Sequence, residues 1–162
     1  MTDAMIVSAR YVVDESLKDL RTAIEGLPGA ALDWRPGGLP AGQAGAETNS
    51  VAVLATHVLH STRWWLSVAL GTPLPDRDRE SEFRAAASDA AALLDLVDAL
   101  SEDCRRLLGS VQEVDWAALR PVGGDPREAP AAFALLHAAG HLREHVGHIA
   151  LTRQLWESRP EP

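Results

Sequence analysis

The stretch Phe133–Trp156 constrains the fold most, because one helical pattern there holds four of the chain's six histidines. It reads FALLHAAGHLREHVGHIALTRQLW, with histidines at positions 137, 141, 145 and 148. Each residue of an α-helix advances by about 100°, so these four side chains fall within an arc of roughly 80°. Apolar residues fill much of the remaining surface. A helix that turns a histidine stripe inward, where polar partners are few, usually turns it towards a metal ion.

His141 and His145 form the sharpest pair, since a spacing of four residues stacks two imidazoles on consecutive turns. Both rings can then reach one ion at roughly 2.0–2.1 Å. An isolated pair of histidines with this spacing is more often two half-buried polar side chains than a metal site. Two observations favour the metal. His57 and His60 lie far upstream in another apolar helix, and Gly147 lets a backbone or a bulky ring come close.

Length, charge and cysteine count limit the classes of protein to which the chain can belong. A length of 162 residues with 46% apolar content fits one domain with a real core. The net charge is −8 and no basic run exceeds two residues, which disfavours nucleic-acid and anionic-membrane partners. The N-terminus lacks the pattern of a signal peptide, and one cysteine excludes an internal disulfide. We therefore expect a single cytoplasmic domain over residues 1–162.

Four segments carry the apolar spacing of three and four residues that is typical of amphipathic helices. We predict helices over residues 5–27, Ser50–Leu70, Ser88–Leu108 and Phe133–Trp156. Thr48, Asn49 or Ser50 is available to cap the second helix, Gly71 and Pro73 are suited to stop it, and Gly109 is suited to follow the third. No strand pattern is convincing. The fold class predicted is all-α, a four-helix bundle.

The connections between these helices are long, which permits crossovers in the bundle. Residues 28–48 are rich in Gly, Pro and Ala, and such a segment is either functional or a plain crossover. We expect Trp34 to fold over the helix ends. Residues 72–83 (TPLPDRDRESEF) are strongly charged, so we expect them to be solvated. A turn at Asp115-Trp116 and a loop rich in Pro and Gly lead into the last helix.

A bundle builds metal sites from inward-facing side chains on facing helices. The natural set here is His57 with His141 and His145. Three neutral imidazoles leave a fourth position open, as in a catalytic site, whereas a structural zinc site more often recruits cysteines. Imidazole ligands suit Zn, Ni, Fe and Cu alike.

Other polar and aromatic residues surround this set. We interpret His60 and His137 as residues beside the ligands or at the surface, and His148 as a hydrogen-bonding group near the metal or a loop cap. Trp64 either walls a substrate pocket or packs in the core.

Residues 141–145, HLREH, also match the H-x-x-E-H signature of inverzincin proteases, in which Glu144 would be the base. Those proteases take a third ligand well downstream, whereas only 17 residues follow His145. Glu144 is therefore a weak catalytic candidate. It could instead orient an imidazole or pair with His148 at the surface.

Several short motifs, taken in order, resemble the DinB/YfiT-like metalloenzymes. They are Leu32-Asp33-Trp34-Arg35-Pro36, Asn49-Ser50-Val51-Ala52 leading into His57, Asp76-Arg77-Asp78-Arg79 with Glu82-Phe83, and His141-xxx-His145-Val146-Gly147-His148. The match spans most of the chain. His148 stands where many relatives have Gln, a departure that leaves the two ligand positions intact.

This resemblance implies a four-helix bundle, a divalent metal held by His57, His141 and His145, and a homodimer. We expect zinc or nickel, with iron or manganese as alternatives. Some characterised relatives are thiol transferases or isomerases that use mycothiol, bacillithiol or glutathione. Arginine outnumbers lysine fourteen to one, which suggests a GC-rich coding sequence and favours mycothiol by association.

Three functions stay open at this point. The first is a metal-dependent enzyme acting on small molecules, of the thiol S-transferase or isomerase type, in which the metal activates a thiol or water. The second is a non-catalytic, dimeric metal- or ligand-binding bundle related to stress. The third is a metal-free helical interaction module.

Overall fold

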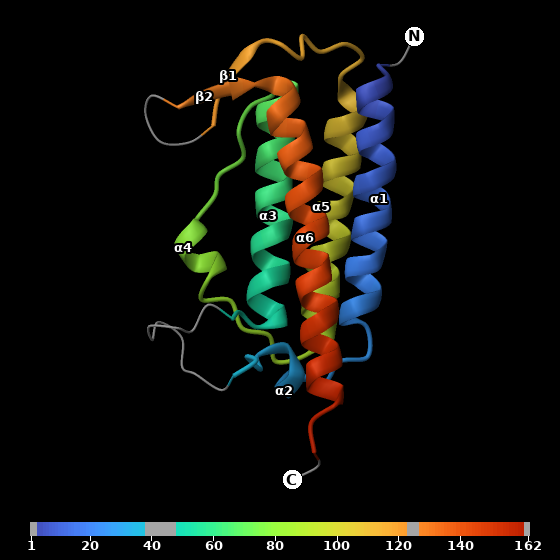
Figure 1. Cartoon of the computed structure of the whole chain (residues 1–162), viewed down its shortest axis with the longest axis vertical. Coiled ribbons are helices and arrows are strands. Elements are labelled where there is room, and N and C mark those ends of the chain that lie inside the picture. Colours follow the sequence, from blue (N-terminus) through green and yellow to red (C-terminus); the bar gives the residue numbers. More distant parts are fainter. Residues whose placement is uncertain (1–2, 38–47, 123–126, 161–162) are drawn as a thin grey trace.

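The structure is a computed structural model that describes residues 3–37, 48–122 and 127–160. Its long helices are α1 (Ala4–Ile24), α3 (Val51–Leu70), α5 (Ala90–Ser110) and α6 (Ala131–Glu157) (Figure 1). The connections hold the short helices α2 (Gly29–Leu32) and α4 (Arg79–Glu82) and the strands β1 (Leu119–Pro121) and β2 (Glu128–Pro130). The predicted all-α four-helix bundle is confirmed. Among the described residues, no helix is long and apolar enough to cross a membrane.

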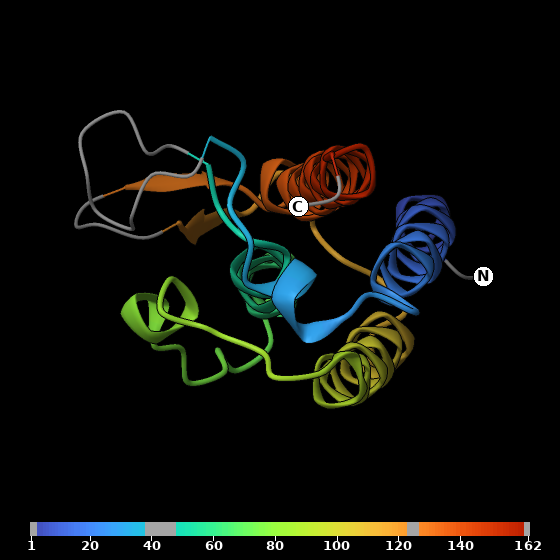
Figure 2. The ribbon, with the colours of Figure 1, turned by 90° about the horizontal axis from the view of Figure 1, so that it is seen from below.

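Seen end-on, the four long helices stand at the corners of a square (Figure 2). Helices α1 and α3 each pack against both α5 and α6, so α1 and α3 are diagonal partners. Helices α3 and α5 run in the same direction, opposite to α1 and α6 (Figure 1). Because neighbours α3 and α5 are parallel, the chain between them must return along the length of the bundle. This crossover carries α4 down the outside of α3 (Figure 1).

The ends of α3 follow from local chemistry. The Ser50 hydroxyl accepts a hydrogen bond from the Val53 amide at 3.3 Å, and Gly71 ends the helix in the left-handed conformation with φ of 67°. Ser50 was one of the three predicted candidates for the cap, and the stop at Gly71 had been predicted. The stop predicted at Gly109 is wrong, since α5 continues to Ser110. Arg10 donates to the carbonyl of Leu108 at 3.1 Å, which satisfies a terminal carbonyl without a left-handed glycine.

Helix α3 is the most enclosed of the four long helices. Fifteen of its 20 residues are buried, so it presents apolar side chains in nearly every direction. Helices α5 and α6 cover two of its sides, and the crossover with α4 covers a third. A polar residue on the α4 side of α3 therefore needs a partner from the crossover.

Two expectations about the connections are corrected by the structure. The segment 72–83 is not uniformly solvated, since Glu82 is only 3% exposed. A small antiparallel hairpin pairs Leu119 with Pro130, where no strand had been predicted. Each strand has three residues, too few for an alternating pattern to be recognised. Residues 38–47 of the first connection and Gly123-Gly124 lie outside the described residues.

Trp34 packs at the end of the bundle, as expected. Its ring lies edge-on to Trp156 at the end of α6, with centroids 5.8 Å apart. The guanidinium of Arg159 lies over the Trp156 ring, 3.2 Å from its centroid. The connection from α1 to α3 is therefore held to the C-terminal end of α6.

We predict that Gly29→Ala lowers the free energy of unfolding by about 1–3 kcal/mol. A methyl group on Gly29 would overlap the backbone carbonyl of Ser88, and neither backbone can easily move. The matched control is Gly140→Ala on α6, where a methyl group meets no atom within 4 Å. Alanine at Gly140 should stabilise by about 0.5–1 kcal/mol. Urea unfolding of both variants tests this, and equal changes would contradict it.

Candidate metal centre

Three histidines meet where α3 faces α6. His57 comes from α3, and His141 and His145 come from consecutive turns of α6. One nitrogen from each ring can be chosen so that all three lie within 4.8 Å of one another. The structure thus brings together the three residues predicted as ligands, across 84 positions of sequence.

The distance between two of these nitrogens identifies what the cluster can hold. The Nε2 atoms of His57 and His141 face each other at 3.2 Å. Two nitrogens that each lie roughly 2.05 Å from one tetrahedral ion are about 3.3 Å apart. The spacing therefore matches one edge of a tetrahedral metal site.

The third histidine of the cluster has a ring nitrogen without a partner among the described residues. Within the part of the chain that the structure describes, Nδ1 of His145 is buried and has no hydrogen-bond partner. A buried polar atom without a partner is unfavourable, and a bound ion or ligand atom would relieve this. The donor set therefore fits a divalent transition metal, which prefers imidazole nitrogens.

Glu82 fixes the orientation of His57. Its Oε2 atom lies 2.9 Å from Nδ1 of His57, and its two carboxylate oxygens accept hydrogen bonds from Arg77 at 2.7 and 2.9 Å. An ionised carboxylate can only accept, so Nδ1 of His57 carries the proton and Nε2 keeps its lone pair. That lone pair points towards His141. A carboxylate behind a histidine ligand is a common way to fix its tautomer.

Glu82 was missed by the sequence reasoning, although its segment had been quoted as a family motif. A local signal was available, because Asp78 stands three residues before Ser81. The Asp78 carboxylate accepts from the Ser81 amide at 3.0 Å, the usual cap of a helix start. The single turn α4 that follows aims Glu82 inward and places the Phe83 ring 4.8 Å from that of His57.

The charges of the cluster follow from burial and from these bonds. Burial acts to raise the pKa of Glu82, but hydrogen bonds from Arg77 and His57 outweigh it and hold the pKa below its usual value. Burial lowers the pKa of His57 despite the nearby carboxylate. Burial and neighbouring histidines lower the pKa of His141 and of His145 to about 4. At neutral pH the imidazoles are uncharged, as metal binding requires.

The other predicted histidines surround the cluster without joining it. His137 stacks on His141 with ring centroids 5.3 Å apart, and His148 is exposed with its ring 5.5 Å from that of His145. His60 is half-buried, and its pKa is lowered mainly by burial.

The remaining candidates lie further out. Glu144 is exposed on α6. Trp64 is half-buried and packs against the core, as does its neighbour Trp65. The ring centroid of Trp65 also lies 4.3 Å from that of His137. Trp65 was missed, because consecutive helical residues point about 100° apart and only Trp64 shares the face of His57.

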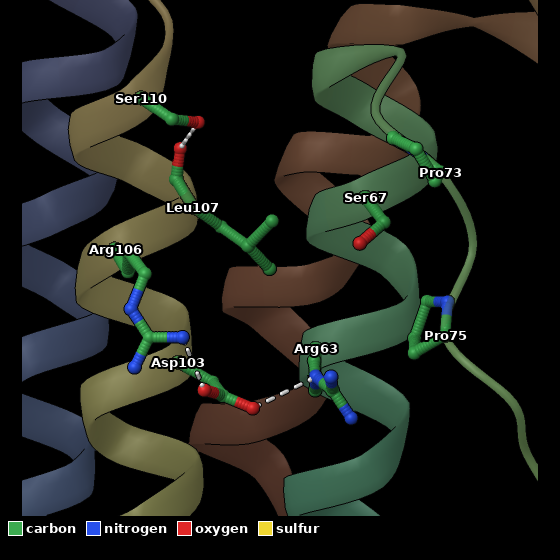
Figure 3. A pocket seen from close by; sticks show the side chains of 8 residues that line it. All are labelled: Arg63, Ser67, Pro73, Pro75, Asp103, Arg106, Leu107 and Ser110. Atoms are coloured by element: carbon green, nitrogen blue, oxygen red, sulfur yellow. Dashed lines mark hydrogen bonds and ion pairs between the residues drawn. The ribbon is translucent and has the colours of Figure 1, made fainter.

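In the described part of the chain, one hollow lies beside the cluster at His145 and another lies along α3. The first hollow has a volume of about 320 Å³ and is lined by His145 and His148 among others. The second, of about 230 Å³, lies between α3 and α5 (Figure 3). There Asp103 accepts from Arg63 at 3.1 Å and from Arg106 at 3.0 Å, so charges pair within the protein. No histidine lines it. The first hollow is therefore the one that adjoins the candidate metal centre.

A sequence model of the DinB superfamily matches residues 13–149, which is most of the chain. The chain belongs to the DinB superfamily. The fold of this DinB protein is also similar to that of a conserved protein from Enterococcus faecalis, whose crystal structure is known. The TM-score is 0.70 at 16% sequence identity, covering 98% of this chain and 99% of the other. No curated protein matches the sequence.

We predict that Glu82→Gln weakens metal binding by roughly 10–100-fold. An amide can offer its NH₂ group to His57 and so stabilise the wrong tautomer, and it loses the charge that pairs with Arg77. Glu80→Gln, two residues away and exposed, is the matched control and should bind as the wild type does. Isothermal titration with Zn²⁺ measures both. Equal affinities in the two variants would remove the role given to Glu82.

We predict that the metal-free protein loses stability as pH falls from about 6.5 to about 4. Because the pKa of His141 and of His145 is about 4 in the folded chain, the unfolded chain binds protons first in this range. Each group contributes on the order of 1 kcal/mol per pH unit. His141→Gln should flatten the fall. Thermal unfolding in a chelator at several pH values measures it, and identical slopes in both proteins would contradict the assignment.

Proposed function

We propose that this DinB protein binds a divalent transition metal through His57, His141 and His145. We further propose that it is a metal-dependent enzyme acting on small molecules, of the thiol S-transferase or isomerase type. The observation that carries the proposal is the 3.2 Å approach of two Nε2 atoms, one of which has its lone pair fixed by Glu82. A metal held there would lower the pKa of a thiol or a water.

The surrounding residues support a reactive site rather than a structural one. Three protein ligands leave a position free for a substrate, whereas structural zinc sites are usually filled by four protein ligands. Glu82 holds a proton on Nδ1 of His57, and Arg77 keeps Glu82 ionised. The Phe83 ring packs against the His57 ring, with centroids 4.8 Å apart. A hollow that opens at His145 leaves room for a small molecule.

The finer features of the proposal rest on chemistry and resemblance. Imidazole nitrogens suit zinc and nickel, with iron or manganese as alternatives. A mycothiol-type thiol is the proposed co-substrate, supported by resemblance and by the arginine-rich composition alone. Glu144 stays a weak candidate for a base, and the cytoplasmic location stays a prediction.

A non-catalytic, dimeric metal- or ligand-binding bundle is the alternative, and the same histidine cluster supports it. Turnover of an electrophile with a low-molecular-weight thiol would favour the enzyme. Its absence across a broad panel, with metal bound, would favour the binding protein. The homodimer is also a proposal, and sedimentation velocity tests it.

We predict that His57→Ala, His141→Ala and His145→Ala each abolish the rise in melting temperature that Zn²⁺ or Ni²⁺ gives the wild type. Metal that binds only the folded chain stabilises it, and two remaining imidazoles hold an ion far less well than three. The matched controls are His60→Ala and His137→Ala, which should keep both the rise and the bound metal. Melting curves with elemental analysis of untagged protein measure this. A His57→Ala variant with the full rise would place the site on α6 alone.

A further inference from the structure

The hollow beside His145 has walls from three parts of the chain. Pro36 comes from the first connection, Leu54 from α3, and Leu151 and Leu155 from α6. These four side chains make the wall mainly apolar. Of the three proposed ligands, His145 is the one among the described lining residues, so a molecule inside the hollow would lie beside the histidine cluster.

The polar side chains of this hollow are largely engaged within the protein. The Thr48 hydroxyl donates to the Pro36 carbonyl at 2.7 Å, and the Thr152 hydroxyl donates to the His148 carbonyl at 2.8 Å. The carbonyl oxygen of the Asn49 side chain accepts from Arg35 at 3.3 Å. The protons of both hydroxyls are thus used before any ligand arrives.

Among the described residues that line the hollow there is no Asp, Glu, Lys or Arg, and the nearby Arg35 is already bonded to Asn49. A carboxylate or ammonium group placed in the hollow away from the histidines would therefore lose water without meeting a charged side chain of this lining, which is unfavourable. A hydrocarbon group would instead be removed from water against leucine side chains.

The size of the hollow sets the size of the ligand. An apolar cavity of roughly 150 Å³ accepts benzene. A hollow of about 320 Å³ is about twice as large, so it holds a molecule of roughly ten non-hydrogen atoms.

We infer that this hollow binds the apolar body of an uncharged small substrate, whose reactive end lies at the three histidines. For the reactive end, this inference rests on the proposed metal function. For the apolar body, it names the class of substrate that the site accepts. Leu151 is the specificity-determining residue at the outer wall, since it is 53% exposed and covers the apolar body. Small thiols and electrophiles with charged tails are excluded.

The test uses the whole chain loaded with Co²⁺ and two thiols of equal size. Heptane-1-thiol and 5-sulfanylpentanoate each have about eight non-hydrogen atoms, but only the second carries a carboxylate, which lies too far from the sulfur to chelate the same ion readily. Binding is followed by the sulfur-to-cobalt charge-transfer absorption. Heptane-1-thiol should bind at least tenfold more tightly, and affinity should rise about two- to fourfold per methylene from ethanethiol through pentane-1-thiol upward. Equal affinities, or a preference for the carboxylate, would overturn the inference.

A matched pair of variants locates the binding in this hollow. Leu151→Glu should keep the cobalt content but bind pentane-1-thiol at least tenfold less tightly. Leu136→Glu is the control, because Leu136 is also an exposed leucine of α6 (65%) and does not line the hollow. If both variants bind cobalt and have the same affinity for the thiol, the inference is overturned but the proposed function is not. A wild type that binds no cobalt would overturn the proposed function as well.

Discussion

The buried carboxylate of Glu82 is the interaction on which the arrangement of the metal centre depends. A buried negative charge is strongly unfavourable unless it is paired and hydrogen-bonded. Glu82 meets that requirement through Arg77 on one side and His57 on the other. The same bonds set the tautomer of His57 and so direct a lone pair towards α6. The carboxylate thus links the connecting segment to α3 through its bond to His57, and His57 in turn faces His141 of α6.

The topology of the bundle explains why this interaction comes from a connection. Parallel neighbours α3 and α5 require a return along the full length of the bundle, and that return passes the outside of α3 at the level of His57. A short hairpin between antiparallel helices would not pass there. The crossover therefore covers α3 and supplies its polar partner at once.

The sequence predicted the parts of this molecule that repeat with a helical period. The long helices and the meeting of His57 with His141 follow from periodic spacing and from the rule that bundles build metal sites from inward-facing side chains on facing helices. Glu82 could not be found in this way, because its position depends on one turn of helix in a charged segment. The β1–β2 hairpin was missed because its strands are too short to show a pattern. The end of α5 was misplaced because Arg10, which is remote in sequence, donates a hydrogen bond to the terminal carbonyl of Leu108. That carbonyl therefore needs no glycine cap.

The placement of Glu82 on a single turn of helix has a consequence for how the molecule responds to metal. A four-residue helix packed on the outside of a bundle can open locally without unfolding the four long helices. Opening it separates Glu82 from His57 and leaves the ring free to turn. Because coupling free energy is reciprocal, a change that holds α4 in place would strengthen metal binding at the proposed site, and an ion there would hold α4 in place by the same amount. Metal binding would in this sense protect a segment at the surface of the bundle from local opening.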